Sequence, residues 1–309
     1  MELYRNLAAL GRHDRAAGCV ATIGAFDGVH LGHQEILGLL RAHAQAAGCP
    51  SLVLSFEPLP KEFFSVDAPP ARLSRFREKF AILNAMGIDI FFCPRFEDLR
   101  HLDPVPFIEE LLVAGLAVRH MVVGHDFRFA AGRRGTMTDL QAAGRRHGFE
   151  VTEVAPVIWR GQRVSSTAVR EALAAGDMSS AAGMLGRPYG MSGRVVRGQG
   201  LGRQLGFPTA NVELARRLSP VMGIFAVRVR LRGQLLDGVA SVGTRPTVDG
   251  TRPLLEVFIF DFDQDIYGEH IVVHFVERLR DEEKFPDLAS MTVQMHQDVL
   301  EARAALAAA

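Results

Sequence analysis

The sequence predicts two domains of different fold class: an α/β domain on a parallel sheet, then an antiparallel β domain that ends in a helix. Three observations support this. The first half alternates apolar, β-branched runs with helical patterns, whereas the second half strings short β-type segments between tight turns. The end of the chain is amphipathic over several helical turns. At 309 residues the chain is long enough for one large or two ordinary domains.

The first half has the alternation of a parallel sheet. Buried strands are predicted at Val20–Ile23, Leu52–Phe56, Ile88–Cys93, Met121–Val123 and Val151–Val154. Helical patterns lie between them, at Leu31–Ala47, Leu73–Met86, Pro104–Leu116 and Thr138–His147. Such alternation implies right-handed crossovers, and ligands of these sheets bind beyond the carboxyl ends of the strands. The turns at residues 24–33, 56–58 and 124–126 fall at that edge.

The character of the chain changes near residue 186, after short helical stretches at Thr167–Ala175 and Met178–Leu185. β-type segments follow at Gly193–Val196, Ile224–Leu231, Leu235–Val242, Leu254–Phe262 and Ile271–Phe275. Short strands with tight turns are typical of an antiparallel barrel or a sandwich. A final helix is expected from about Asp287 to Leu306. We therefore expect one domain over residues 1–186 and another over residues 187–309.

Composition and charge limit the classes of partner. The chain is 48% apolar and 23% charged, with 35 basic and 35 acidic residues, so nothing global predicts binding to nucleic acid or to a membrane surface. The N-terminus lacks a signal-peptide pattern, and no apolar run approaches the length of a membrane span. Cys19, Cys49 and Cys93 show no metal-binding spacing, which predicts free buried thiols in a reducing cytoplasm. Nothing in the sequence indicates an oligomeric state.

The stretch Gly24–His33 carries the strongest chemical signal of the first half. It joins a predicted strand to a predicted helix, and His30 and His33 share one face at the start of that helix. A helix start attracts anions, and Gly28 and Gly32 let the backbone approach a ligand closely. Three interpretations stay open: ordinary surface histidines, a metal pair without an obvious third ligand, and a polyphosphate site, which the pattern favours over the metal.

A hydroxyl-rich group, Ser165, Ser166 and Thr167, precedes a predicted helix that carries Arg170. Hydroxyl residues before a helix are ordinary N-caps. Together with Arg170 they can also hold a triphosphate and neutralise charge on a pyrophosphate leaving group. The pattern alone does not separate these two interpretations.

The second half has two candidate site features. The alternate glycines of Gly198–Asn211 favour a loop that can wrap a phosphate, although many such loops are only hairpin turns. No buried strand–helix unit surrounds the loop, so it is not a dinucleotide fingerprint. Glu256 stands in an apolar run, where an acid is unusual. Alternation along the strand leaves open whether Glu256 points outward.

Taken together, these motifs resemble those of one family, the bifunctional riboflavin kinase/FMN adenylyltransferases, which are the prokaryotic FAD synthetases. Gly24–His33 looks like the family's GxFDGxHxGH motif, Ser165–Arg170 resembles its SSTxxR motif, and Val123–Phe129 resembles its VGxDFRF segment. The order and the spacing of the motifs fit as well. The resemblance implies a Rossmann-like nucleotidyltransferase domain with a parallel sheet.

The resemblance also implies roles in that first domain. His30 and His33 would hold the ATP phosphates, and Arg170 with the serine hydroxyls would steady the departing pyrophosphate. The nucleotide-binding residues implied are Gly24, Phe26, Asp27, Gly32, Asp126, Ser165, Ser166 and Thr167. FMN already carries an anionic phosphate, so its attack on ATP needs no general base. Ala25 departs from the family, in which Asn is common at this position.

The second half resembles the riboflavin kinase part of the same family. Gly198–Asn211 is similar to its GxGxGRxxGFPTAN signature, Leu254–Phe262 to its LEVxxxDF segment and Leu279–Phe285 to its LRxExKF segment. The resemblance implies an antiparallel β-barrel with a terminal helix. The implied roles are nucleotide binding for Gly198, Gly200, Gly202 and Arg203, Mg²⁺ binding for Thr209 and Asn211, and flavin binding for Arg280 and Phe285. Glu256 would accept the proton of the flavin's terminal ribityl hydroxyl.

The function that the resemblance implies has two steps. Riboflavin is phosphorylated to FMN with ATP, FMN is adenylylated to FAD with release of pyrophosphate, and Mg²⁺ serves both steps. One alternative is a chain with only the kinase active, given Ala25, and another is a flavin- or nucleotide-binding regulator without catalysis. Nucleic-acid recognition is a weaker rival, because Arg145-Arg146-His147 is too short for a basic stripe.

Overall fold

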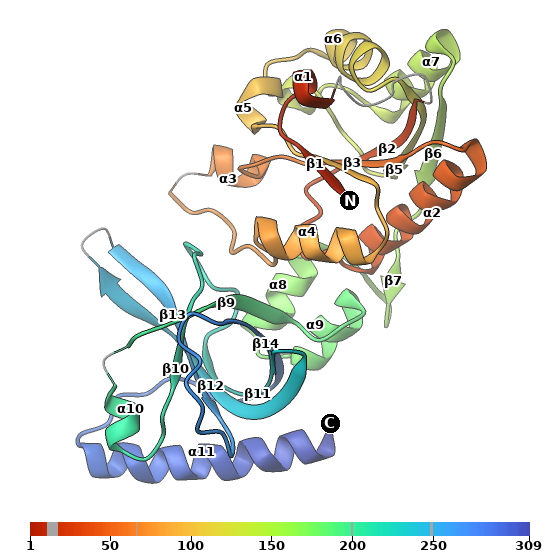
Figure 1. The fold of residues 1–309 in the computed structure, drawn as a ribbon. Coiled ribbons are helices and arrows are strands. Elements are labelled where there is room, and N and C mark those ends of the chain that lie inside the picture. Colours follow the sequence, from red (N-terminus) through yellow and green to blue (C-terminus); the bar gives the residue numbers. More distant parts are fainter. Residues whose placement is uncertain (11–17, 66, 199, 248–249) are drawn as a thin grey trace. The chain divides into compact units, whose positions relative to one another are not determined.

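The computed structural model describes residues 1–10, 18–65, 67–198, 200–247 and 250–309. Backbone contacts divide the chain into two compact units, each with its own set of elements (Figure 1). Unit 1 comprises Met1–Pro70 and Phe76–Val164, and unit 2 comprises Ser165–Ala309 together with the short segment Ala71–Arg75. The domain boundary expected near residue 186 stays a prediction.

Unit 1 is built on a six-stranded parallel sheet in the order β1-β4-β3-β2-β5-β6, which confirms the predicted parallel sheet. The strands are β1 (Glu2–Tyr4), β2 (Cys19–Ile23), β3 (Ser51–Leu54), β4 (Ile90–Phe92), β5 (Val118–Gly124) and β6 (Glu150–Val154). The sequence pattern does not predict β1, because its three residues are exposed or half-buried and so form no apolar run.

Helices connect these strands at the predicted places. The longer ones are α2 (Leu31–Ala47), α4 (Phe76–Ala85), α6 (Pro104–Pro106) continued by the π-helix η2 (Phe107–Gly115), and α7 (Met137–His147). The short elements are α1 (Leu7–Leu10), α3 (Pro60–Phe64), α5 (Phe96–Leu99), η3 (Ala131–Arg133), β7 (Ile158–Trp159) and β8 (Gln162–Arg163). The helix predicted from Leu73 begins instead at Phe76. The residues before it, Ala71–Arg75, group with unit 2, where Arg75 donates hydrogen bonds to the carbonyl oxygens of Ser192 and Leu214.

Two apolar layers cover the two faces of the sheet. On one face, Leu37 of α2 and Leu83 of α4 pack with Val20 of β2. On the other face, Leu140 of α7 packs in a cluster with Ala21, the next residue of the same strand. Successive strand residues thus face opposite layers, as expected for strands that are buried on both sides. The turns that follow the strands lie at the carboxyl edge of the sheet.

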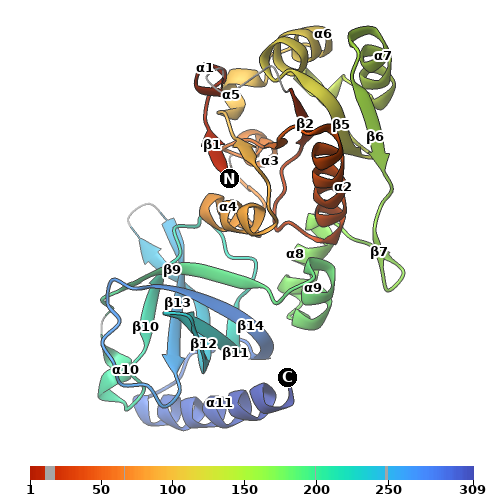
Figure 2. The same ribbon diagram turned by 45° about the vertical axis from the view of Figure 1, so that its right-hand side comes forward.

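Unit 2 is built on a closed antiparallel barrel in the order β10-β13-β12-β11-β14-β9 (Figure 2). The strands are β9 (Gly190–Val196), β10 (Ala210–Glu213), β11 (Gly223–Leu231), β12 (Gln234–Thr247), β13 (Gly250–Ile259) and β14 (His270–Arg280). Of the two architectures that the strand pattern left open, the barrel is therefore confirmed. The pattern misses β10, a four-residue strand at the end of the glycine-rich motif.

The helices that accompany the barrel within the described ranges are α8 (Ser166–Ala174), α9 (Met178–Leu185), α10 (Leu201–Gln204) and α11 (Leu288–Ala308). α8 packs on α9 and α9 on β14, so both helices group with the barrel. α11 lies along the barrel, where Ala302 and Leu306 pack with Ala226 and Phe260 (Figure 2). Among the helices of the described residues, none is both long enough and apolar enough to cross a membrane.

Candidate active sites

The turn between β2 and α2 lies where the strand order of unit 1 reverses. β2 pairs with β3 on one side and with β5 on the other, and the chain runs from β3 to β4 before it returns to β5. Ligands of such sheets bind in the crevice at this reversal, beyond the carboxyl ends of the strands. Gly24–His33 and Gly124–Asp126 therefore meet at one edge, and a Cβ on Gly124 would lie 3.7 Å from Ile36 Cδ1 of α2.

The backbone of this turn is unusual. Phe26, Gly28 and Val29 have positive φ angles of 48°, 81° and 43°, which are disfavoured for residues with a side chain and above all for a β-branched one. The ring of Phe26 lies over Gly24, where a Cβ would be 3.1 Å from it. Phe26 and Asp27 are both buried. The surrounding core thus holds the turn in a conformation that the chain would not adopt alone.

His30 and His33 form a stacked pair at the start of α2. Their ring centroids are 3.6 Å apart with 16° between the planes, and His30 Nδ1 accepts the backbone N–H of His33 at 3.3 Å, which caps the helix. Burial, then the charges of His30 and Lys79, hold the pKa of His33 well below its usual 6.5. His33 is therefore neutral at neutral pH. A Cβ on Gly32 would lie 3.3 Å from the His30 ring, so a side chain there would press on the cap.

Lys79 of α4 lies behind the turn, and none of the motifs includes it. The residue is 2% exposed, and its Nζ donates to the Ala25 carbonyl oxygen at 2.5 Å and to Ser55 Oγ at 3.3 Å. Ser55, which follows β3, donates to the same carbonyl oxygen at 3.2 Å. A buried ammonium thus anchors the first turn residues of the predicted phosphate-binding motif, at Ala25, and adds positive charge there.

The loop after β5 carries Asp126, whose exposed carboxylate accepts a hydrogen bond from Arg163 Nη2 at 2.7 Å. Partial burial by itself raises the pKa of Asp126, but the hydrogen bond and the charge of Arg163 bring it below its ordinary value. Phe127 stacks on Phe129 at 5.6 Å between centroids, and Phe129 packs on Phe107 of η2 at 5.2 Å. The aromatic contacts tie this loop to the core of unit 1.

Ser165, Ser166, Thr167 and Arg170 belong to unit 2, whereas the two histidines belong to unit 1. Ser165 is the N-cap of α8, and its Oγ accepts the backbone N–H three residues on at 3.1 Å. Arg170 donates from Nε to the Ala71 carbonyl oxygen at 2.6 Å and from Nη1 to that of Ser166 at 3.1 Å. The capping interpretation is thus confirmed for Ser165, and contact of this group with a triphosphate stays a prediction.

Unit 2 contains a cavity of about 740 Å³ between the barrel, the glycine-rich loop, the segment after β14 and α11. Most of the residues predicted for the kinase reaction line it, namely Gly200, Gly202, Thr209, Asn211, Glu256, Arg280 and Phe285. Arg203, which is exposed on α10, does not line this cavity. The structure therefore brings together residues that are far apart in the sequence.

Glu256 of β13 is the middle one of three residues that lie side by side on neighbouring strands of the barrel. It is paired with Asn211 of β10 on one side and with Ser241 of β12 on the other, so the three side chains project from one face. Leu255 and Val257, which project from the opposite face, are fully buried. The face that carries Glu256 lines the cavity. Glu256 therefore points toward the cavity, and its role as the base stays a prediction.

The glycine-rich loop approaches the two predicted metal ligands closely. A Cβ on Gly198 would lie 2.3 Å from Asn211 Nδ2, so this approach requires a glycine. A Cβ on Gly202 would lie 3.2 Å from Thr209 Oγ1. Asn211 is buried. A hydroxyl and an amide are therefore held beside the loop, one of them next to Glu256 in the strand register.

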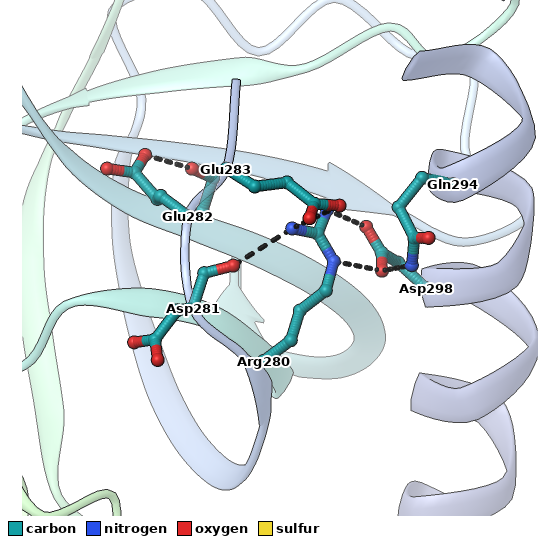
Figure 3. A network of polar contacts seen from close by, with 7 residues as sticks. Arg280, Asp281, Glu282, Glu283, Gln294 and Asp298 are labelled. Carbon is teal, nitrogen blue, oxygen red and sulfur yellow. Dashed lines mark hydrogen bonds and ion pairs between the residues drawn. The ribbon is translucent and has the colours of Figure 1, made fainter. Parts of the chain in front are cut away.

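Arg280, the last residue of β14, is the centre of a polar network beside the cavity (Figure 3). Its Nε and Nη2 donate to the two carboxylate oxygens of Asp298 on α11, each at 2.7 Å. Gln294 Nε2 donates to Asp298 Oδ1 at 3.0 Å, and Arg280 Nη1 donates to the Asp281 carbonyl oxygen at 2.9 Å. The hydrogen bond to Asp298 raises the pKa of Arg280. The guanidinium lies 5.8 Å from the centroid of the Phe285 ring.

Known proteins match the chain over nearly its full length. Residues 12–168 match the family model for FAD synthetase, and residues 185–306 match that for riboflavin kinase. The chain is 46% identical over 305 residues to the bifunctional riboflavin kinase/FMN adenylyltransferase of Escherichia coli strain K12, which covers 98% of this chain and 97% of the relative. The chain belongs to this bifunctional family.

A second relative and a solved structure are also similar to the chain over nearly its full length. The Haemophilus influenzae protein of the same description is 44% identical over 307 residues, with 98% of this chain and 99% of the relative covered. A solved structure from Streptococcus pneumoniae, described as a macrolide-efflux protein, aligns with a TM-score of 0.81 at 30% identity and covers 96% of each chain. That likeness supports the fold of both the FAD synthetase and the riboflavin kinase parts.

Both parts of this bifunctional chain contain residues that the motifs did not indicate. In the riboflavin kinase part, that residue is Asp298, which lines the cavity. Glu282, which belongs to the segment similar to LRxExKF but was given no role, also lines the cavity, and its Oε1 accepts a hydrogen bond from Ser241 Oγ at 3.2 Å. In the FAD synthetase part the added residue is Lys79. The sequence does hold a signal for Asp298 and Lys79: each is a charged residue on the apolar face of a predicted helix. Asp298, for example, precedes the buried Ala302 by four positions and so shares its face.

Proposed function

We propose that the two reactions of this family run at two separate sites of the chain. Unit 2 converts riboflavin to FMN with ATP, and the carboxyl edge of the unit 1 sheet serves the conversion of FMN to FAD with release of pyrophosphate. The observation that carries the proposal is the convergence of Thr209, Asn211 and Glu256 on one cavity of unit 2, while the histidine pair stands in unit 1. We assign residues 1–186 to the adenylyltransferase and residues 187–309 to the kinase.

In the kinase reaction, Glu256 accepts the proton of the flavin's terminal ribityl hydroxyl while that oxygen attacks the γ-phosphorus of ATP. The hydroxyl is a poor nucleophile, and a positioned carboxylate supports its attack. The bond between the γ-phosphorus and the bridging oxygen breaks, and ADP leaves with the electron pair. Asn211 and Ser241 flank Glu256 in the strand register, so all three side chains project toward the same cavity.

The donors of this cavity fit Mg²⁺. Thr209 and Asn211 offer a hydroxyl and an amide oxygen, neutral ligands that leave room for the phosphates of ATP. The loop at Gly198 comes so close to Asn211 that a Cβ would fill the space beside its amide. Mg²⁺ held by Thr209 and Asn211 would offset the charge that develops on the phosphates. We assign the ATP phosphates of this site to Gly198, Gly200, Gly202 and Arg203.

The apolar side of the same cavity suits a flavin ring. It is lined by Phe258, Met291, Met295 and Val299, and flat aromatic ligands bind in such pockets with a few polar groups to orient them. Arg280 and Phe285 line the same cavity. We assign both to the flavin.

In the adenylyl-transfer reaction, a phosphate oxygen of FMN attacks the α-phosphorus of ATP, and pyrophosphate leaves. Because the nucleophile is already anionic, catalysis consists of positioning and charge stabilisation. His30 and His33 hold the ATP phosphates at the start of α2, where backbone N–H groups face an anion. We assign the rest of the nucleotide to Gly24, Phe26, Asp27, Gly32 and Asp126, and the pyrophosphate to Ser165, Ser166, Thr167 and Arg170.

We assign this enzyme to the cytoplasm. Both reactions consume ATP, which is a cytoplasmic substrate. Cys19, Cys49 and Cys93 are free thiols in the structure, and free thiols persist in a reducing compartment.

A chromatographic time course tests the proposed function. The purified chain is given riboflavin, ATP and Mg²⁺, and we expect FMN to rise first and FAD to follow. A second reaction started from FMN should give FAD directly, and a chelator should stop both. FMN that accumulates without FAD would leave only the kinase active, as Ala25 suggested. Riboflavin that is bound but unchanged would refute the proposed function in favour of a binding protein.

A further inference from the structure

α11 forms one wall of the unit 2 cavity. Met291, Met295, Asp298 and Val299, at successive turns of the helix, line it. Further along the helix, Ala302 and Leu306 pack against the barrel. The N-terminal half of α11 therefore faces the cavity, and its distance from the barrel sets the width of the space assigned to the flavin.

A paired charge joins this half of the helix to the barrel. Asp298 is 4% exposed, and both of its carboxylate oxygens accept hydrogen bonds from Arg280, at 2.7 Å each. A bidentate carboxylate–guanidinium contact fixes direction as well as distance. Gln294, one turn earlier on α11, donates to Asp298 Oδ1 at 3.0 Å. Figure 3 shows the carboxylate of Asp298 turned toward the guanidinium plane of Arg280.

The same guanidinium also holds the segment after β14. Arg280 Nη1 donates to the Asp281 carbonyl oxygen at 2.9 Å and lies 3.6 Å from Glu283 Oε1. The Phe285 ring lies 5.8 Å from the guanidinium carbon, within reach of a cation–π attraction. One carboxylate, that of Asp298, therefore restrains both the helix wall and the segment that carries Phe285.

We propose that Asp298 is a positioning residue of the riboflavin kinase site, which sets the flavin pocket through Arg280. The inference rests on the proposed function of unit 2, because the flavin is assigned to this cavity there. Asp298 acts on flavin binding rather than on phosphoryl transfer, because its partners form the flavin side of the cavity and Glu256 stands on another strand. Removing its charge takes the bidentate partner from a half-buried guanidinium, and helix and segment then shift apart.

The variant Asp298→Asn tests this with little change of shape. We expect the KM for riboflavin to rise about 10-fold, with kcat and the KM for ATP changed less than about 2-fold. Riboflavin binding without ATP, followed by flavin fluorescence, should weaken by a similar factor. Conversion of FMN to FAD in the same preparation should not change. The matched control is Glu277→Gln, which removes the same charge from an exposed position of β14.

Arg280→Lys provides a second test that does not depend on the folding of the first variant. It keeps the charge but loses the bidentate contact, so the KM for riboflavin should rise in the same direction. The double variant should be no worse than the more affected single variant, because both changes break one contact. Unchanged riboflavin KM and binding in Asp298→Asn would overturn the inference, as would a fall in kcat at constant KM. A wild-type chain that forms no FMN would refute the proposed function instead.

Discussion

The two units assemble their sites in different ways. In unit 1, the turn and the histidine pair follow one another along one strand–turn–helix segment, so local chain geometry brings them together. In unit 2, Thr209, Glu256 and Arg280 come from separate parts of the barrel and meet only when it closes. The comparison teaches that the first site depends on the shape of a turn, whereas the second depends on strand register and on the helix that covers the barrel.

Each site is also supported by a buried charge, and the two charges have opposite sign. Lys79 donates a hydrogen bond to the Ala25 carbonyl oxygen in the turn between β2 and α2. Asp298 accepts hydrogen bonds from the Arg280 guanidinium beside the cavity of unit 2. A buried charge is costly unless it is hydrogen-bonded, so each marks a place where position is strictly held. Because both sites lie on one chain, the activity of one unit serves as an internal control for variants of the other.

The sharpest way to separate the two sites is Glu256→Gln. The amide cannot accept the ribityl proton, so kcat for FMN formation should fall about 1,000-fold, while conversion of supplied FMN to FAD continues at the wild-type rate. The two rates are measured separately by chromatography. Glu277→Gln, at an exposed position of β14, is the control acid. Wild-type FMN formation by Glu256→Gln would refute the assignment of the base.

The reverse separation is expected from His30→Ala. This change removes the cap of α2 and one half of the stacked pair, so FAD formation should fall about 100-fold with FMN formation unchanged. His43→Ala is the matched control, because His43 lies on the same helix but packs against His120, with ring centroids 4.0 Å apart and the planes tilted by 43°. If His30→Ala still formed FAD at the wild-type rate, another group would have to hold the phosphates.

A smaller effect on FAD formation is expected from Lys79→Met. The apolar side chain fills similar space but leaves the Ala25 carbonyl oxygen without its ammonium, so kcat/KM for FAD formation should fall about 10-fold. Lys79→Arg keeps the charge and should retain more activity than Lys79→Met. Equal loss in both variants would mean that Lys79 acts through packing alone, and no loss in either would remove it from the site. The kinase rate of each variant reports on general folding.

The smallest effect concerns the stability of unit 1 at acid pH. The pKa of His33 is lower in the folded chain than its unfolded value of 6.5, through burial and then through His30 and Lys79. The unfolded state therefore binds the proton more readily than the folded state. The contribution of neutral His33 to the free energy of unfolding is fully present above pH 6.5 and declines as the pH falls below it. We expect the unfolding temperature to drop between pH 7.5 and pH 5, and to drop less in His33→Gln. An equal drop in the two proteins would contradict the low pKa.

The contrast between the units also explains how far the sequence could predict the structure. The apolar period predicts α2 and α9 with the bounds that the structure has, because each helix buries one continuous face. The apolar period does not predict the short strands β1 and β10, because three or four residues are too few to show a period. In the same way, the contiguous motif of unit 1 is visible in the sequence, whereas the pairing of Glu256 with Ser241 is not.

The sequence by itself determined the class of each half, the turn with its two histidines, and the residue types of the kinase motif, because these depend on neighbours along the chain. The strand pattern left a barrel and a sandwich open, and the family resemblance implied the barrel. Only the tertiary structure decided that Glu256 faces a cavity, that Lys79 lies buried against the Ala25 carbonyl oxygen, and that Asp298 is buried beside the cavity. These features depend on which distant segments meet. Strand register and helix packing set those meetings, and no local pattern of residues encodes them.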